Sequence, residues 1–132
     1  VRIFRGTWSV DKQQRMLDCI RSCIKNHRVT NVAIALLKPH QLNPEIEALY
    51  DHLKAICSEK NILVSTFLPT ALNSFCSHDR PTKRHMMEAI ANCYPELVML
   101  YRKEMQNRSK YYYKLFEAVG VATLLARSAT LE

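Results

Sequence analysis

Glycine is scarce in this chain, and its scarcity excludes two kinds of nucleotide-binding enzyme. Only Gly6 and Gly120 are present among the 132 residues, so the sequence contains neither the glycine-rich phosphate loop nor the glycine fingerprint for dinucleotides. A Gly-x-Ser-x-Gly motif is missing too, and no local signature points to a Ser, His and acid triad. The sequence therefore predicts no cofactor and carries no local sign of a hydrolase.

Long apolar runs are also lacking. No stretch approaches the ~20 apolar residues that cross a bilayer, and no charged start followed by an apolar stretch indicates a signal peptide. We therefore expect no membrane partner. The chain begins at Val1 rather than Met and ends at Glu132, and we expect it to be a piece of a longer protein.

Sequence patterns that bind metals are incomplete. The five cysteines are odd in number, and three lie within apolar helical or strand patterns, where a free thiol packs as a small hydrophobe. This usage favours a reducing intracellular compartment, nuclear or cytoplasmic. Cys19 and Cys23 are four apart on one predicted helix face, but no Cys-x-x-Cys motif or histidine pair completes a site. The sequence thus predicts no metal.

The composition that remains is typical of one folded, basic domain. Hydrophobic residues make up 48% and charged residues 23%, the ordinary balance of a globular protein. A chain of 132 residues can bury one substantial core, so we expect a single α/β domain over 1–132. The formal net charge of +7 creates a positive potential that attracts nucleic acid or an acidic protein surface.

Apolar spacing predicts short strands that alternate with amphipathic helices. Strands are expected at 1–8, 32–37 and 62–68, and helices at 10–27 and 44–60. Right-handed crossovers make such strands parallel. The second and third strands are apolar on both faces, which places them in the middle of a sheet.

Capping signals mark the helix starts, and the second half of the chain is predominantly helical. Ser9 or Asp11 offers the first N-cap, and Asn43-Pro44-Glu45 gives the second helix a cap, a first-turn proline and an early acid. After a polar loop at 73–81, a helix opens at Pro81-Thr82 and is interrupted by Pro95. A short helical pattern at 97–101 leads to a final helix, which is apolar nearly all round over 118–126 and is expected to lie against the sheet.

Three segments of the helical half resemble one protein family. They are the loop at 77–84, the helix ending in Tyr94-Pro95-Glu96-Leu97, and the segment Leu115-Phe116-Glu117-Ala118-Val119-Gly120-Val121-Ala122. In this order they resemble the back half of RuvC-like Holliday junction resolvases of the RNase H superfamily. The resemblance spans most of the chain and implies an RNase H-like sheet flanked by helices, with its first strands missing.

The functional residues of that family are mostly absent. The resemblance implies carboxylates that hold two divalent ions, but no strand with a leading Asp precedes Val1, and Ala35 stands where the family has Glu. Where the final helix of the family carries two acids, this chain has Lys114 and Glu117. Glu117 is either a helix-edge residue or a relic of the metal site. The resemblance thus predicts a pseudo-nuclease kept for binding or assembly.

Basic and aromatic residues are interleaved in the same half. Such residues combine cations for phosphates with rings that can stack on bases. The candidates for nucleic-acid binding are Lys83, Arg84, Arg102, Lys103, Arg108, Lys110, Tyr111, Tyr112 and Lys114. The alternative is an ordinary solvated helix face, with some of the tyrosines in the core; the set in question is Tyr101, Tyr111, Tyr112 and Tyr113.

Three functional hypotheses follow from the sequence. The first is a catalytically inactive RuvC-like or RNase H-like module that binds nucleic acid or serves as a scaffold. The second is a flavodoxin-like α/β domain that binds another protein, and the third is a fragment of an active metal-dependent junction nuclease. In the first fold a missing strand separates the strands at 1–8 and 32–37, whereas in the second fold they pair directly.

Overall fold

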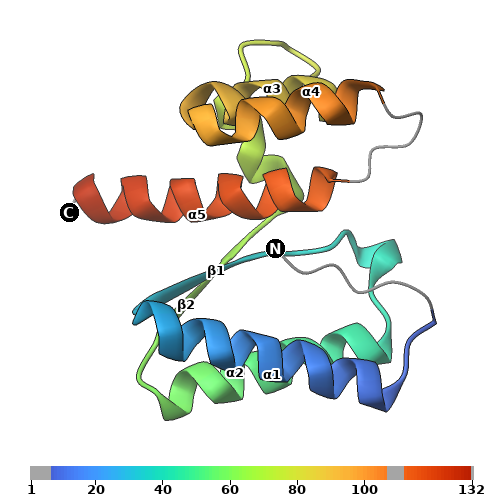
Figure 1. The fold of residues 1–132 in the computed structure, drawn as a ribbon, viewed down its shortest axis with the longest axis vertical. Coiled ribbons are helices and arrows are strands. Elements are labelled where there is room, and N and C mark those ends of the chain that lie inside the picture. The colour runs from blue at the N-terminus through green and yellow to red at the C-terminus, as the bar shows by residue number, and fades with distance from the viewer. Residues whose placement is uncertain (1–6, 107–111, 132) are drawn as a thin grey trace. The chain divides into compact units, whose positions relative to one another are not determined.

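The structure, a computed structural model, describes residues 7–106 and 112–131 (Figure 1). The helices are α1 (Val10–His27), α2 (Pro44–Glu59), α3 (Lys83–Cys93), α4 (Val98–Gln106) and α5 (Tyr113–Leu131), with short 3-10 helices η1 (Pro39–Gln41), η2 (Pro69–Phe75) and η3 (Pro95–Leu97). The strands are β1 (Asn31–Ala35) and β2 (Leu63–Phe67). Most of the strand predicted at 1–8 lies outside the described residues.

The chain divides into two compact units. The first unit comprises Val1–Val32 and Lys38–Ser65, and the second comprises Ala33–Leu37 and Thr66–Glu132. The first unit therefore carries α1 and α2, and the second carries α3, α4 and α5. The expectation of a single domain over 1–132 stays a prediction.

β1 and β2 pair in parallel, as the crossover rule predicts. The backbone N–H of Leu63 donates to the carbonyl of Thr30 at 3.2 Å at one end of the pair, and that of Leu36 donates to the carbonyl of Phe67 at 2.9 Å at the other. The α/β class is thus confirmed, with a largely helical C-terminal half.

The size of the sheet differs from the prediction. Within the described part of the chain the sheet has two strands. The apolar runs predicted as central strands, at 32–37 and 62–68, are therefore not central in this sheet. A two-stranded sheet does not fit an RNase H-like fold. The exposure of the side chains also shows that the two strands are only partly covered by the rest of the protein. Ile34 on β1 is buried, but Leu63 on β2 is 70% exposed. A continuous apolar run is compatible with either position, because it does not report how many strands lie beside it.

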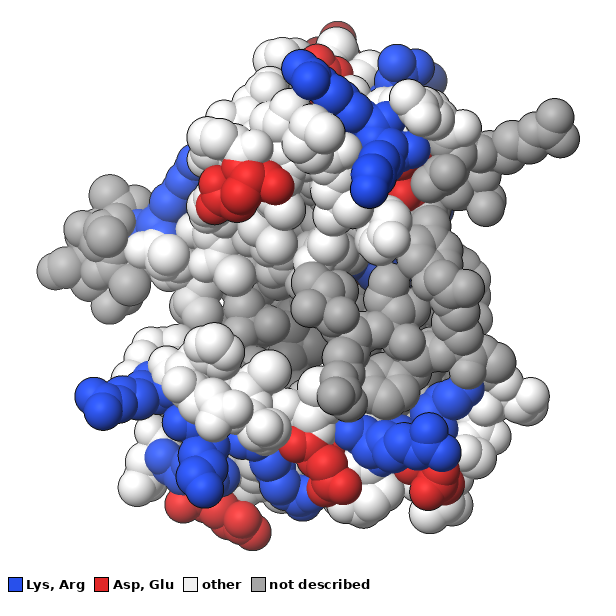
Figure 2. Space-filling view, viewed as in Figure 1, with Lys and Arg blue, Asp and Glu red and all other residues white. Residues whose placement is uncertain are grey.

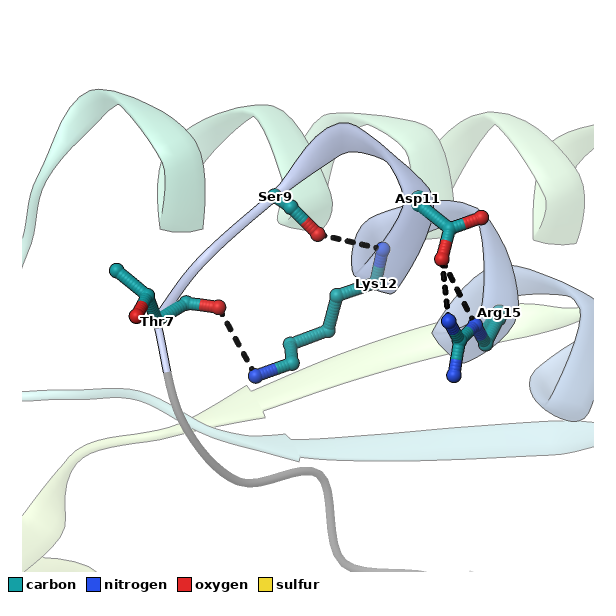
Figure 3. Close-up of polar contacts among 5 residues, drawn as sticks. All are labelled: Thr7, Ser9, Asp11, Lys12 and Arg15. Atoms are coloured by element: carbon teal, nitrogen blue, oxygen red, sulfur yellow. Dashed lines mark hydrogen bonds and ion pairs between the residues drawn. The ribbon is translucent and has the colours of Figure 1, made fainter.

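Local capping explains why α1 begins where it does (Figure 3). Ser9 has extended backbone, and its hydroxyl accepts from the backbone N–H of Lys12 at 3.1 Å, which satisfies one of the unpaired donors of the first turn. Asp11 lies in that turn and forms an ion pair with Arg15 one turn later. The Lys12 ammonium donates to the carbonyl of Thr7 at 3.0 Å. Of the two predicted caps, Ser9 is the correct one.

The other predicted helix starts are also confirmed. Asn43 Oδ1 accepts from the backbone N–H of Ile46 at 2.9 Å, and Pro44 occupies the first helical position. Thr82 caps α3, and its hydroxyl accepts from the backbone N–H of His85 at 3.2 Å.

The core of the first unit lies where α1 and α2 pack on each other. Its buried side chains are Leu17, Ile24, Ile56, Cys57 and Ile62. Burial raises the pKa of the Cys57 thiol, so this residue stays protonated and packs as a small hydrophobe. All five cysteines of the chain are free thiols.

The core of the second unit is built mainly from α3, α5 and η2. Its buried members are Leu72, Met86, Met87, Ile90, Ala91, Phe116 and Val121. The main neighbours of α5 are α3 and η2, while Ala33, Ala35 and Phe67 from the strands pack against the same cluster. The final helix therefore packs chiefly on helices, with strand residues of its own unit beside it.

Among the described residues, no helix combines the length and apolar character needed to span a bilayer.

Candidate functional site

Two lysines from different helices of the second unit converge on one tyrosine ring. The Lys83 ammonium, at the start of α3, lies 5.0 Å from the centroid of the Tyr113 ring, and the Lys114 ammonium, on α5, lies 5.8 Å from it. Contacts of this kind stabilise by about 0.5–1 kcal/mol at exposed sites. They orient the two cations without removing them from water, since Lys83 and Lys114 are both exposed.

Glu117 lies beside this pair of cations and is buried. The residue is 7% exposed, and its Oε1 accepts from the Lys114 ammonium at 3.1 Å. Burying a carboxylate is costly unless it is paired, and Lys114 supplies the pairing charge from the preceding turn of α5. Glu117 is therefore not a solvent-facing residue at a helix edge, and its ion pair accounts for its burial.

The phenol of Tyr113 completes the cluster. Burial, the charge of Glu117 and a hydrogen bond to Glu117 together raise the pKa of Tyr113 to about 12. The hydroxyl is thus a firm proton donor to the carboxylate. We call Lys83, Tyr113, Lys114 and Glu117 the lysine–tyrosine cluster. It holds two cations and one carboxylate.

Further basic residues of the predicted set lie on the same unit. Arg84 on α3 and Arg102 and Lys103 on α4 are exposed. Figure 2 shows several neighbouring Lys and Arg side chains on the face that carries α3 and α4, with acidic side chains between some of them. Arg108, Lys110 and Tyr111 lie outside the described residues.

The described tyrosines of the predicted set are similar in burial. Tyr101, Tyr112 and Tyr113 are all partly buried and pack against the core cluster of the second unit. These rings therefore contact the core without being fully buried in it. A partly buried ring offers less surface for stacking on a base, so Tyr112 is a weaker candidate than its exposed basic neighbours.

One buried acid was not predicted from the sequence. Glu104 on α4 is completely buried, at 0% exposure. A signal for it was present, because Leu97, Leu100, Tyr101 and Glu104 recur at helical spacing and so share one face of the helix. The position of this acid on an apolar face, rather than its residue type, indicates its burial.

The carboxylates do not assemble into a metal centre within the described part of the chain. No group of three or more His, Cys, Asp or Glu side chains there is arranged to hold a metal ion. Glu117 is bonded to an ammonium, which occupies an oxygen that a divalent cation would need and places a like charge beside it.

In comparisons with known proteins, no family model, no curated protein and no solved structure matches the chain.

Proposed function

We propose that the second unit binds nucleic acid through its exposed cations, with the lysine–tyrosine cluster as a fixed contact to the phosphate backbone. The observation that carries this proposal is the convergence of Lys83 and Lys114 on the Tyr113 ring, at 5.0 and 5.8 Å from its centroid. Two ammonium groups held near one point form a local excess of positive charge, even after the single charge of Glu117 is counted.

Phosphate binding follows from the chemistry of these groups. Lysine binds phosphate as a point charge, and arginine binds it through paired N–H donors. Each phosphate that a cation neutralises releases condensed counterions, and this release supplies most of the affinity of non-specific binding. The exposed side chains of Arg84, Arg102 and Lys103 extend the cationic surface beyond the lysine–tyrosine cluster.

The family proposal is a catalytically inactive member of the RuvC-like or RNase H-like superfamily. It is supported by the order of elements, a parallel strand pair with α2 between the strands and then a helical half, and by the three sequence segments that resemble the resolvases. The two-stranded sheet of the described residues is smaller than this fold requires, so the proposal needs further strands beside β1 or β2. Ala35 and Lys114 stand at positions where the family has acids. We therefore propose that the chain binds nucleic acid without cleaving it.

Binding assays on charge-matched variants test the proposed function. The triple variant Lys83→Ala, Arg84→Ala, Lys103→Ala removes three exposed cations of the second unit and leaves Lys114 in place as the partner of Glu117. Fluorescence anisotropy with labelled duplex, branched and single-stranded probes should show a loss of affinity on the order of tenfold or more at moderate salt.

The matched control is Lys25→Ala, Lys54→Ala, Lys60→Ala, which removes three exposed cations from the first unit. This control should bind within about threefold of the parent, because a uniform change in net charge has only a screened, long-range effect. Equal losses for both variants would contradict an interface on the second unit. An absence of binding at low salt would contradict the function itself.

Protein binding is the second candidate, and one observation favours it. In the described residues each strand of the sheet has one edge with no strand beside it. Leu63, the first residue of β2, is 70% exposed, and Leu68, which follows β2, is 65% exposed. Unpaired strand edges accept a strand from another chain. An absence of nucleic-acid binding by the parent protein at low salt would make this the leading hypothesis.

A further inference from the structure

Two histidine rings are stacked on each other at the start of α3. The rings of His78 and His85 are 3.7 Å apart between centroids and 8° from parallel. His78 is exposed in the loop that follows η2, and His85 is partly buried in the first turn of α3. Histidine is the side chain that ordinarily changes its charge between pH 5 and pH 8, so two groups that titrate in this range are in direct contact here.

His85 also belongs to the cap of α3. The hydroxyl of Thr82 accepts from the backbone N–H of His85 at 3.2 Å, and the backbone N–H of Thr82 donates to Nδ1 of His85 at 3.2 Å. This arrangement is a capping box in which histidine replaces the usual Glu or Gln at the third helical position. Because an Nδ1 atom that accepts a hydrogen bond carries no proton, the closed box requires the neutral imidazole with its proton on Nε2.

Protonation of both rings opposes the stack and the cap. A proton on His78 alone leaves the cap intact, but an imidazolium at His85 has an N–H at each ring nitrogen, so its Nδ1 can no longer accept from Thr82. Two imidazolium rings with centroids 3.7 Å apart repel each other. The helix dipole also opposes a positive charge in the first turn. The stacked and capped arrangement therefore binds a second proton more weakly than an open arrangement does.

Charged and titratable groups surround the pair on several elements. Those that line the surface hollow around the two rings, or flank the histidines in sequence, are Cys76, Asp79, Arg80, Lys83, Arg84, Glu88, Cys93 and Arg127. Asp79 and Glu88 favour an imidazolium, but both are exposed, so water and salt screen their charges. Burial raises the pKa of the Cys76 thiol, and Cys93 is also a free thiol. The cations of this set, which include Arg127 of α5, outnumber the two carboxylates and oppose a further positive charge.

From these contacts we infer that the His78–His85 pair is a pH-sensitive switch that keeps the start of α3 closed near neutral pH and opens it when both rings are protonated. Because the closed arrangement binds the second proton more weakly, its contribution to stability is present near neutral pH and is lost as the pH falls towards about 5. Lys83 directly follows Thr82, and its ammonium lies 5.0 Å from the centroid of the Tyr113 ring. Opening of this turn therefore also releases a cation of the lysine–tyrosine cluster. The switch itself does not depend on nucleic-acid binding.

Amide hydrogen exchange, followed by NMR on the whole chain without nucleic acid, tests the switch. After correction for the intrinsic pH dependence of exchange, protection of the Thr82 and His85 amides should fall about tenfold in the parent from about pH 7 to about pH 5. His85→Gln places an acceptor that does not titrate at the same position, so protection of its Thr82 amide should stay within about twofold. The Lys12 amide is an internal control, since its acceptor is the hydroxyl of Ser9. His40→Gln, at an exposed histidine of η1 in the first unit, is the matched variant and should respond as the parent does.

The result for the parent decides the inference even if a variant fails to fold. Constant protection of the Thr82 and His85 amides in the parent across this pH range would overturn the switch, and so would an equal fall of protection in a folded His85→Gln variant. A parallel loss of protection at the Lys12 amide would overturn it too, because the opening would then not be specific to α3. None of these outcomes bears on phosphate binding, which the salt dependence of nucleic-acid binding tests separately.

Discussion

The phenol of Tyr113 keeps its proton at a pH at which an exposed tyrosine has lost it, because burial and the charge of Glu117 raise its pKa from 10.0 to about 12. The folded state thus binds this proton more tightly than the unfolded state does. Its contribution to stability is complete below pH 10 and is lost as the pH rises from about 10 to about 12.

Tyr113→Phe should therefore lose less stability than the parent as the pH rises from about 10 to about 12. Thermal unfolding of the parent and the variant at a series of alkaline pH values measures this difference in stability. Because the other titrating groups are present in both proteins, their effects are removed when the two are compared. Phenolate absorbance provides an independent check, since the variant should lack the tyrosine that titrates near pH 12. If the stability of the two proteins falls equally with pH over this range, the raised pKa of Tyr113 is contradicted.

Glu117→Gln should change both the acidity of Tyr113 and the affinity for nucleic acid. Without the carboxylate charge, one of the causes that raise the pKa of Tyr113 is removed, so that pKa should fall towards 10 while burial keeps it above that value. The cluster also loses its one negative charge, the carboxylate that pairs with Lys114 at 3.1 Å, so its net positive charge rises and affinity for phosphate should increase several-fold at low salt. Phenolate titration and anisotropy measure the two effects. Weaker binding by a folded variant would count against the cluster as a phosphate contact.

The sequence predicted the cations of this cluster but not their arrangement. Lys83, Lys114 and Glu117 were each recognised by residue type and position. Their proximity could not be predicted, because it depends on how α3 packs on α5. The pairing of Glu117 with Lys114 one turn away was within reach, since residues three apart are neighbours on a helix.

Close packing of α5 on α3 and η2 requires a residue without a side chain at Gly120. A Cβ atom there would lie 2.6 Å from Leu72 Cδ2 and 2.9 Å from Ile90 Cδ1, and both neighbours are buried members of the core. Gly120→Val should therefore lower the free energy of unfolding by about 1–3 kcal/mol through overpacking, as measured by chemical denaturation. Ala122→Val, at an exposed position two residues further along α5, should cost about 0.5 kcal/mol or less. Similar values for the two variants would show that α5 is not packed as described.

Helices were predicted more accurately than the sheet. Ser9, Asn43 and Thr82 mark helix starts through hydrogen bonds to the next turn, and such signals are local and visible in the sequence. The 3-10 helix η2 (Pro69–Phe75) was missed, and part of it falls in the segment predicted as a polar loop. The number of strands beside β1 and β2 depends on distant segments, so the apolar runs alone could not predict it.

The whole chain should be insensitive to divalent metal ions if its acids do not form a catalytic centre. A ligand stabilises a fold only in proportion to its binding, and the carboxylate of Glu117 is already bonded to Lys114. Millimolar Mg²⁺ or Mn²⁺ should therefore shift the melting temperature by no more than about 1 °C. A saturable rise of several degrees would instead favour the hypothesis of a metal-dependent nuclease.

Basic residues are spread over both units, so net charge alone does not locate an interface. In the second unit the Tyr113 ring holds two cations, Lys83 and Lys114, and Glu117 also pairs with Lys114. Fixed cations lose less conformational entropy on binding than free ones do. For this reason we expect the phosphate contacts on the second unit.

The salt dependence of binding tests phosphate binding by the second unit most directly. The logarithm of the binding constant should fall linearly with the logarithm of salt concentration, with a slope of roughly −0.7 to −0.9 for each phosphate neutralised. Lys83→Ala, Arg84→Ala, Lys103→Ala should reduce the magnitude of that slope by about two to three units, whereas the triple lysine variant of the first unit should keep the parent slope. Identical slopes for the parent and both variants would contradict phosphate binding by the second unit.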